Sequence, residues 1–348
     1  MPSPSGAEAE AVGALRRAVA GRPLRSEVDG AGSLHLSYGD GPKRLLLLGH
    51  VDTVSGGPAV HDDGTWLHGR GSVDAKGPLC AAVAALIGTA EEGSLGPDWT
   101  VHLVAAVGEE APGSPGARRL LDDSGPPDAM IVLEPSGWDA VTLGYKGHLR
   151  ARLRCDRPSA HSAGPAASAA DRVVRAAAAL LSALDDEGAD GPAESGAFGR
   201  LTGTVTSLRH AHDGAVETAE ATLGLRLPPD RPPEAVRAWL AERLAGSEVR
   251  CAVDDAVPAV RGPADGPLAR AFRVAIRGAG GRPRRVVKTG TSDWNVVARR
   301  WTVPALAYGP GDAAYDHTPD ERIAWSDYDA GVRVLRTALA RITDGGAA

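Results

Sequence analysis

The sequence has few cysteines and no long apolar run. Its three cysteines, Cys80, Cys155 and Cys251, are far apart and form no CxxC pair, which argues against a disulfide framework or a thiolate metal site. No hydrophobic segment approaches the roughly 20 residues that a membrane-spanning helix needs. Residues 1–10 are small, polar and acidic, unlike a signal peptide, and are interpreted as a frayed, low-complexity end. We therefore expect a cytoplasmic protein with reduced thiols.

Lysine is also scarce, and the overall charge is negative. Lysine occurs only at Lys43, Lys76, Lys146 and Lys288, and arginine provides the rest of the 38 basic residues. The formal net charge of −6 argues against nucleic acid or an anionic membrane as the main partner. At 348 residues, the chain is long for one hydrophobic core, so two domains are expected.

The first part of the chain alternates strand-like and helix-like segments. Apolar runs at residues 44–49, 100–107 and 129–134 predict buried parallel strands, with helices at residues 79–90 and 117–122. This alternation predicts an α/β fold in which helices flank a largely parallel sheet. Such sheets place their functional sites after the carboxyl ends of the strands.

The pattern changes after Gly144 and returns to α/β character after Pro258. Between these points, six segments follow a β-α-β-β-α-β order that is typical of a compact, ferredoxin-like α+β domain; they lie at residues 148–155, 166–184, 200–208, 219–227, after Pro232-Pro233, and at 248–253. We predict a catalytic domain formed by residues 1–145 and 257–348, with residues 146–256 inserted into it.

Five short motifs carry side chains that bind metals. They are Gly49-His50-Val51-Asp52-Thr53, Gly69-Arg70-Gly71-Ser72-Val73-Asp74-Ala75-Lys76-Gly77, Glu109-Glu110, Glu134-Pro135 and His317. Two divalent ions a few Å apart need mixed histidine and carboxylate ligands, one of them bridging. Two imidazoles and three carboxylates suit Zn²⁺, Co²⁺ or Mn²⁺. The motifs therefore predict a two-metal hydrolase.

The side chains suggest separate roles within this set. Asp52 is placed two residues after His50 to hold its second ring nitrogen. Asp74 lies in a glycine-rich loop that opens a helix, and its two carboxylate oxygens could bridge two cations. Of the adjacent pair Glu109 and Glu110, one carboxylate could bind metal while the other takes a proton from the attacking water.

In type and order, these motifs resemble the M20 metallopeptidase/deacylase family over nearly the whole chain. The resemblance implies that His50 and Glu134 bind one ion, that Glu110 and His317 bind the other, and that Asp74 bridges them. It also implies that Glu109 is the general acid/base and that Asp52 orients His50. Two divalent ions are implied, with Zn²⁺ favoured and Co²⁺ an alternative. Ser55 stands where the family often has proline.

The inserted segment resembles the family's lid, which commonly mediates homodimerisation. Gly144-Tyr145-Lys146-Gly147 and Ser159-Ala160-His161-Ser162 match a lid motif whose histidine, here His161, reaches the active site of the second subunit and stabilises the developing oxyanion. Leu225-Arg226-Leu227-Pro228-Pro229 resembles a family segment in which the arginine, here Arg226, grips a substrate carboxylate, although Gly224 replaces the usual aspartate.

Two segments narrow the resemblance. Residues 73–79 and 288–295 look most like the branch that releases lysine or ornithine from a small acidic amino-group carrier protein, which holds the amino acid on the side chain of its C-terminal glutamate. Substrate contacts are then expected from Lys288, Thr289, Gly290, Thr291, Ser292 and Asn295. A positive surface would attract such a carrier; its candidates are Arg282, Arg284, Arg285, Lys288, Arg299 and Arg300.

Other functions remain open from the sequence. The chain could be an N-acyl amino acid deacylase, of the acetylornithine deacetylase or succinyl-diaminopimelate desuccinylase type, or a dipeptidase. It could also release an unusual amino acid in secondary metabolism. A non-catalytic, metal-binding family member is a further alternative, against which the intact Glu109-Glu110 pair argues.

Overall fold

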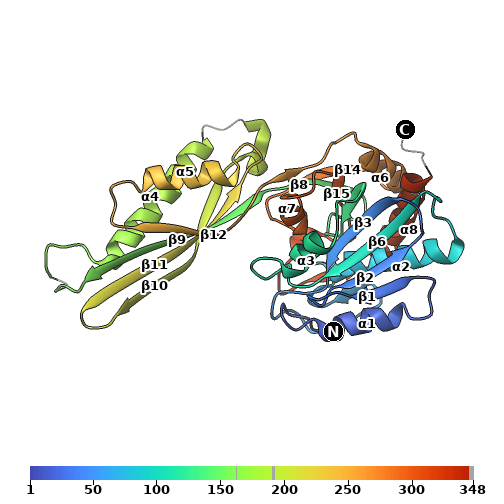
Figure 1. Ribbon diagram of the computed structural model, residues 1–348, viewed down its shortest axis with the longest axis horizontal. Coiled ribbons are helices and arrows are strands. Elements are labelled where there is room, and N and C mark those ends of the chain that lie inside the picture. Colours follow the sequence, from blue (N-terminus) through green and yellow to red (C-terminus); the bar gives the residue numbers. More distant parts are fainter. Residues whose placement is uncertain (162, 190–192, 345–348) are drawn as a thin grey trace. The chain divides into compact units, whose positions relative to one another are not determined.

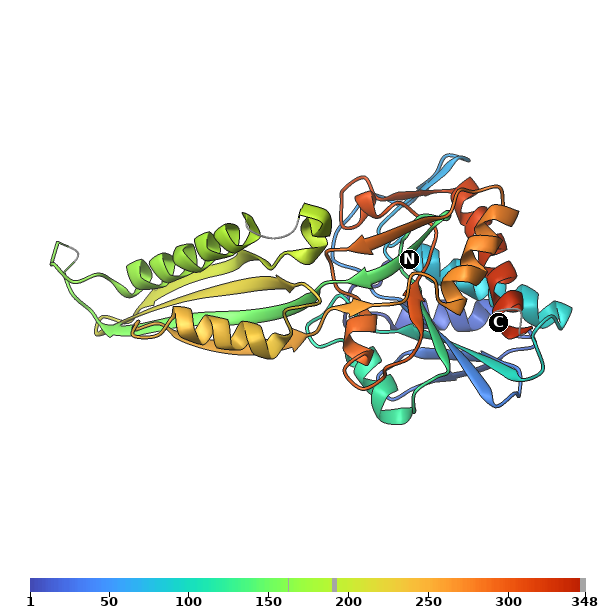
Figure 2. The same cartoon turned by 90° about the horizontal axis from the view of Figure 1, so that it is seen from above.

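The computed structural model describes residues 1–161, 163–189 and 193–344. The chain divides into two compact units (Figures 1 and 2). The first contains Met1–Gly144, Arg261–Val287 and Ser292–Ala348, and the second contains Tyr145–Val260 and Lys288–Thr291. The predicted catalytic domain included Tyr145, residues 257–260 and Lys288–Thr291, which the structure groups with the second unit.

The first unit contains a nine-stranded sheet among the residues described. Its strand order is β1-β2-β6-β3-β7-β15-β8-β13, with β14 beside β8. Four central strands run parallel, as the sequence predicts: β6 (Trp99–Ala106), β3 (Lys43–His50), β7 (Ala129–Val132) and β15 (Ala305–Ala307). The others are β1 (Arg25–Val28), β2 (Leu34–Tyr38), β8 (Ala140–Tyr145), β13 (Val260–Arg261) and β14 (Arg284–Lys288).

Strand β3 shows why the centre of the sheet is parallel. Residues 45–48 are four consecutive leucines, all at most 3% exposed, so both faces of the strand are covered. Parallel strands need this two-sided burial because their crossover helices lie on the faces of the sheet. Residue His50 pairs with Ala106 of β6 in the register, which places the ends of β3 and β6 together.

The helices of the first unit are α1 (Ala9–Ala18), α2 (Lys76–Glu92), α3 (Pro115–Asp123), α6 (Pro267–Gly278), α7 (Asp293–Val297) and α8 (Trp325–Thr343). Helix α8 packs against both α2 and α6 (Figure 1). A small sheet joins β16 (Arg322–Ala324), β5 (Trp66–His68) and β4 (His61–Asp62), and η2 is a short 3₁₀ helix (Ala313–Tyr315). No helix in the described ranges is both long and apolar enough to span a membrane.

The second unit has the predicted β-α-β-β-α-β order. Its elements are β9 (Gly147–Pro158), α4 (Ala169–Ala189), a 3₁₀ helix η1 (Ala193–Gly199), β10 (Thr202–His212), β11 (Val216–Leu227), α5 (Pro233–Arg243) and β12 (Arg250–Val257). The sheet order is β10-β11-β9-β12, and neighbouring strands are antiparallel. Leu149, Ala151 and Leu153 alternate inward from β9 and share a core with Val173 and Val236.

Candidate metal centre

The predicted metal ligands come from loops that follow parallel strands. His50 ends β3, Glu109 and Glu110 follow β6, and Glu134 follows β7. Because β6, β3 and β7 are parallel neighbours, their carboxyl ends meet at one edge of the sheet. A side chain at Gly49 would place its Cβ 2.8 Å from Cβ of Leu133, so glycine permits the close approach of β3 to the end of β7.

Asp74 lies between two histidines. Its Oδ1 is 3.2 Å from Nε2 of His50, and its Oδ2 is 3.0 Å from Nε2 of His317. Glu134 Oε1 lies 3.8 Å from the same His50 nitrogen, and Glu110 Oε1 lies 2.7 Å from the same His317 nitrogen. Each oxygen of Asp74 therefore faces a different histidine–glutamate pair, which is the arrangement of a bridging carboxylate.

Ligand atoms converge in three overlapping groups, within each of which they lie no more than 4.8 Å apart. One group is His50, Asp74 and Glu134, and a second is Asp74, Glu110 and His317. The third joins His50 to Glu109 and Glu110. Because the first two groups share Asp74, the chain brings together all five side chains that the sequence singled out as ligands.

The donor set fits two divalent cations. Four carboxylates, those of Asp74, Glu109, Glu110 and Glu134, meet around two imidazoles in a largely buried place, and such a concentration of negative charge is costly without cations. Imidazole and carboxylate ligands are those of Zn²⁺, Co²⁺ and Mn²⁺ sites. His50 and Glu134 are buried, whereas the His317 side chain is 48% exposed, so the cluster opens to solvent on the His317 side.

The electrostatics of the cluster depend on burial and on these contacts. Burial would raise the pKa of Asp74, but hydrogen bonds to His317 and His50 lower it well below its usual range. Hydrogen bonds to Asp74 and Glu110 raise the pKa of His317 to about 10. Burial raises the pKa of Glu109 well above its ordinary value against the opposing charge of His50, and the charges of Asp293, Glu134 and Glu110 raise it further.

Asp52 contacts more of the site than its predicted role required. The ring nitrogen Nδ1 of His50 lies 3.0 Å from the main-chain oxygen of Asp52 and 3.4 Å from carboxylate Oδ1. The carboxylate itself accepts the backbone N–H groups of Glu109 and Glu110, each at 3.0 Å. Asp52 thus connects the His50 loop to the main chain of the glutamate pair, and its carbonyl is the nearer partner of the histidine.

The N-terminal segment is part of the site, which corrects the interpretation of residues 1–10 as frayed. Ser3 is fully buried and donates from its hydroxyl to the carbonyl of Val51 at 2.8 Å. The amide of Thr53 donates to the carbonyl of Ser3 at 2.9 Å. The hydroxyl of Ser5 donates to Oδ2 of Asp52 at 2.7 Å. Small polar residues look disordered in a sequence, but here they are hydrogen-bonded beneath the His50 loop.

Asp293 is a buried carboxylate that the sequence did not single out. It begins α7 and is only 2% exposed. Burial and the nearby charge of Asp52 raise its pKa to about 7, against the opposing effect of His50. Asp293 lies within residues 288–295, the segment that the sequence analysis named, and this position is the signal that could have identified it.

The predicted substrate residues fall into two groups. Ser292 and Asn295 are buried, and the amide of Ser292 donates to Oδ1 of Asn295 at 2.9 Å where α7 begins. This places them inside the fold, where they support α7. In the second unit, Nη1 of Arg226 donates to Oγ1 of Thr291 at 3.1 Å, within the segment that also holds Lys288, Thr289 and Gly290.

His161 and Lys146 also belong to the second unit. His161 is exposed, and its Nδ1 accepts the backbone N–H of Ala163 at 3.1 Å; the end of its motif, Ser162, lies outside the described residues. Lys146 is fully buried, and its ammonium donates to the carbonyls of Ala197 and Arg200. Burial lowers the pKa of Lys146 to about 8, with a further contribution from the positive charge of Arg226. Lys146 therefore connects η1 and the residues before β10 to the chain just before β9.

The predicted positive surface is smaller than its arginine content suggested. Arg284 pairs with Asp139 at 2.6 Å, Arg285 with Asp265 at 2.8 Å, and Arg300 with Asp122 at 2.8 Å. These three carboxylates offset much of the local charge. Three of the six basic side chains named near residues 288–295 are therefore paired with acidic side chains, which reduces the local positive charge, and attraction of an acidic carrier stays a prediction.

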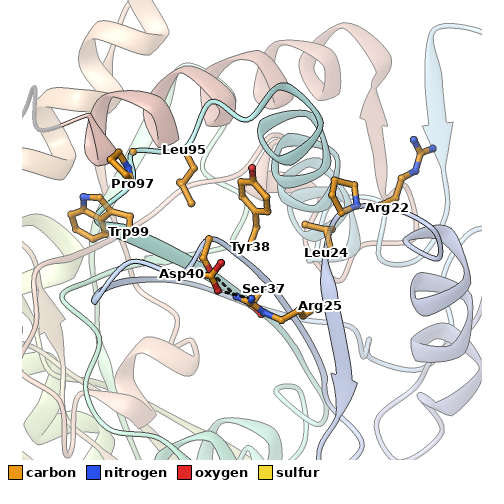
Figure 3. Close-up of a pocket in the computed structure, with 12 residues that line it drawn as sticks. Arg22, Leu24, Arg25, Ser37, Tyr38, Asp40, Leu95, Pro97 and Trp99 are labelled. Atoms are coloured by element: carbon orange, nitrogen blue, oxygen red, sulfur yellow. Dashed lines mark hydrogen bonds and ion pairs between the residues drawn. The ribbon is translucent and has the colours of Figure 1, made fainter.

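A separate cavity of about 440 Å³ opens at the other edge of the central sheet (Figure 3). Its walls include Trp99, which begins β6, and Tyr38, which ends β2. Its guanidinium groups are engaged, since Arg25 pairs with Asp40 and Arg22 pairs with Glu91. The cavity lies at the amino end of β6, away from the carboxyl end that leads to the metal cluster.

The chain is similar to known proteins over nearly its whole length. The chain is 43% identical to the LysW-lysine hydrolase of Deinococcus radiodurans, over 99% of this chain and 95% of the relative. It is 25% identical to the LysW-lysine/LysW-ornithine hydrolase of Saccharolobus solfataricus, over 98% and 92%. Its fold is similar to that of an M20 family metallo-carboxypeptidase from Sulfolobus solfataricus, with a TM-score of 0.81 at 18% identity, covering 99% and 97% of the two chains.

The fold and the site together define a metal-dependent hydrolase of amide bonds. Residues 46–341 match the peptidase family M20/M25/M40, and the chain belongs to that family. The resemblance inferred from the five motifs is thereby confirmed. A dinuclear metal-binding peptidase of the M20 family from Bacillus subtilis also shares the fold, with a TM-score of 0.68 at 12% identity, covering 99% and 92% of the two chains.

Proposed function

We propose that this protein releases lysine, ornithine or a related diamino acid from a small acidic amino-group carrier protein. The bond cut is the amide between the amino acid and the side-chain carboxyl of the carrier's C-terminal glutamate. The observation that carries the proposal is full-length similarity, at 43% identity, to a LysW-lysine hydrolase, in a chain whose ligand cluster is complete. The exposed His317 side of the cluster gives a substrate access to it.

The residues present would hold two ions in a shared site. His50 and Glu134 would bind one, Glu110 and His317 the other, and Asp74 both, in keeping with the distances from its two oxygens. Zn²⁺ is the proposed metal and Co²⁺ the alternative, since both accept mixed imidazole and carboxylate ligands. When bound, such ions polarise a carbonyl and acidify water.

Glu109 is the proposed general acid/base. It lies within 4.8 Å of the His50 and Glu110 ligand atoms, and burial raises its pKa, which suits a carboxylate that takes up a proton. Its carboxylate takes a proton from the attacking water and delivers it to the nitrogen of the departing amino acid. Asp52 keeps Glu109 in place through the backbone hydrogen bond. Water supplies the hydroxyl of the new carboxyl group and the proton of the new amine as the amide bond breaks.

The second unit is the proposed lid, substrate-recognition element and dimerisation domain. Arg226 and the Lys288–Thr291 segment share a hydrogen bond, and a guanidinium suits the carboxylate of an amino acid. His161 is proposed to stabilise the oxyanion in the other subunit of a homodimer. Strand β10 lies at the sheet edge and exposes Leu208 and Val205, apolar surface that a second copy would cover. The proposed location is the cytoplasm.

A parallel substrate panel tests the proposal. The metal-loaded protein is incubated with lysine-charged carrier, with acetylornithine and with succinyl-diaminopimelate, and the released products are separated by chromatography. We expect release from the carrier at a kcat/KM at least about tenfold above that for either small substrate. Activity confined to the small acylated substrates would contradict the carrier proposal and favour a free amino acid deacylase.

A further inference from the structure

Glu321 is a fully buried carboxylate that contacts the loop carrying Asp74. It lies four residues after His317, immediately before β16, and is 0% exposed. Its Oε1 accepts three backbone N–H groups, from Gly71 at 2.9 Å, Val73 at 3.0 Å and Asp74 at 3.1 Å. Successive N–H groups that point at one anion form a nest, which fixes the local path of the chain.

The other oxygen of Glu321 is also satisfied. Oε2 pairs with Nη1 of Arg70 at 2.5 Å, and Nη2 of the same guanidinium donates to the carbonyl of Thr318 at 3.2 Å. The amide of Gly69 donates to the main-chain oxygen of Glu321 at 3.0 Å. A buried carboxylate is tolerated when a cation and several hydrogen bonds compensate its charge. Neutralising the carboxylate leaves the buried guanidinium group without its counter-charge. Residues 69–74 and 318–321 are therefore joined as one assembly.

This assembly connects two ligands that lie far apart in the sequence. Residues 71 and 321 are 250 positions apart, yet Glu321 binds the amide of Asp74 and Arg70 binds the carbonyl beside His317. Asp74 can direct one oxygen to each histidine only if its backbone is held in place relative to both. His317 adopts a left-handed φ of 60°, which a non-glycine residue keeps only when its surroundings enforce it.

We infer that Glu321 is a positioning residue that sets the distance between Asp74 and His317 and thereby the affinity of the cluster for its pair of divalent ions. The inference rests on the proposed metal centre but not on the identity of the substrate. Glu321 touches neither ligand atom, so it acts through the backbone of the Asp74 loop. Groups that orient metal ligands in this way typically change metal affinity by about 10- to 100-fold when they are replaced.

The test compares Glu321→Gln with the native protein and with Glu217→Gln. Glu217 is the matched control, since it accepts one backbone N–H, from Ala169 at 2.8 Å, and lies in the second unit. Zinc affinity and stoichiometry are measured by competition with a coloured chelator, and melting temperatures are recorded with and without Zn²⁺. We expect Glu321→Gln to weaken binding of at least one ion about tenfold or more and to reduce the Zn²⁺-induced rise in Tm. Glu217→Gln should match the native protein in both.

A merely structural role would lower the Tm of the metal-free protein and leave the zinc-induced rise and the affinity unchanged, and that outcome would overturn the inference. If Glu321→Gln does not fold, Glu321→Asp keeps the charge on a shorter side chain, and the visible spectrum of its Co²⁺ form reports ligand geometry. A spectrum and affinity identical to the native form would equally contradict the inference. If the native protein binds two ions but leaves the charged carrier intact, the proposed function is refuted and the inference on Glu321 is not.

Discussion

The hydroxyl of Ser5 donates a 2.7 Å hydrogen bond to Oδ2 of Asp52, which joins the N-terminal segment to the metal cluster. The same oxygen accepts the amide of Glu110. Burial would raise the pKa of Asp52, but the hydrogen bond and charge of His50 lower it, and the hydrogen bonds from Ser5 and Glu110 add to this effect. The N-terminal segment thus adds a third contact to the Asp52 carboxylate, which already supports the His50 loop and the glutamate pair.

Replacing Ser5 should therefore reduce activity although the residue is not a ligand. We expect Ser5→Ala to lower kcat about tenfold, because the Asp52 carboxylate loses a charge-assisted hydrogen bond. Ser5→Thr keeps the hydroxyl and should restore most of the loss. The matched control is Ser168→Ala, which removes a similar 2.8 Å hydrogen bond to Asp171 in the second unit. Equal kcat values for Ser5→Ala and Ser168→Ala would contradict this prediction.

Glu109→Gln should separate catalysis from metal binding. Glutamine keeps the shape of the side chain but cannot take a proton, so we expect turnover to fall by about 10²- to 10⁴-fold while two ions per chain remain bound. Metal content is measured by atomic emission on dialysed protein and turnover by amino acid release. The companion variant Glu110→Gln should instead lose metal. Near-normal turnover of Glu109→Gln would show that another group transfers the proton.

Asp74→Asn should prevent the two ions from binding together. An amide offers one oxygen and no charge, whereas the native carboxylate directs one oxygen to each histidine. We expect at most one tightly bound ion per chain and a Zn²⁺-induced rise in Tm below that of the native protein. Asp213→Asn, in a turn of the second unit, serves as the control. Two tightly bound ions in Asp74→Asn would show that another group bridges them.

Stability should fall as the pH drops from about 6.5 towards 4, owing to His102. Burial lowers the pKa of His102 to about 4, helped by the charges of His35 and Arg44. In the unfolded chain, His102 has an ordinary pKa near 6.5. Between about pH 6.5 and 4, the unfolded chain therefore binds a proton at His102 that the folded protein does not, and this favours unfolding. The contribution is at most about 1.4 kcal/mol per pH unit. Urea unfolding of the metal-free protein at pH 7, 6 and 5 measures it.

The variant His102→Gln provides the comparison for this pH dependence. It removes the titrating ring from β6 and should flatten the decline of the unfolding free energy between pH 7 and 5. The acidic residues of the cluster remain in both proteins, so their contribution cancels in the difference. Parallel slopes for the native protein and His102→Gln would assign the pH dependence to other groups.

The sequence predicted the parallel centre of the sheet and its ligands for a physical reason. Continuous apolar runs such as residues 45–48 can only be buried on both faces, and parallel strands bring the loops after their carboxyl ends to one edge of the sheet. His50, Glu110 and Glu134 were therefore predictable as neighbours. The β-α-β-β-α-β order of the second unit was equally predictable, since the alternation of Leu149, Ala151 and Leu153 is local.

The contacts that the sequence did not predict join residues that are far apart in the chain and meet only in the folded protein. Glu321 is a single acid with no periodic pattern, and its role exists only because residues 69–74 fold back on it. Ser5 lies in a stretch whose composition suggests disorder. The acidic partners of Arg284 and Arg300 are more than 140 residues away in sequence. The number of basic residues at positions 282–300 therefore overstated the positive charge of this surface. These contacts have no local signal.

Release of the amino acid from the carrier is the most direct test of the central claim. Lysine-charged carrier is incubated with Zn²⁺-loaded protein, with Glu109→Gln and with chelated protein, and intact masses are followed over time. The account predicts conversion to uncharged carrier plus free lysine with the native protein, and unchanged charged carrier with the other two. A charged carrier that persists with the native protein, while the same preparation hydrolyses acetylornithine, would contradict it.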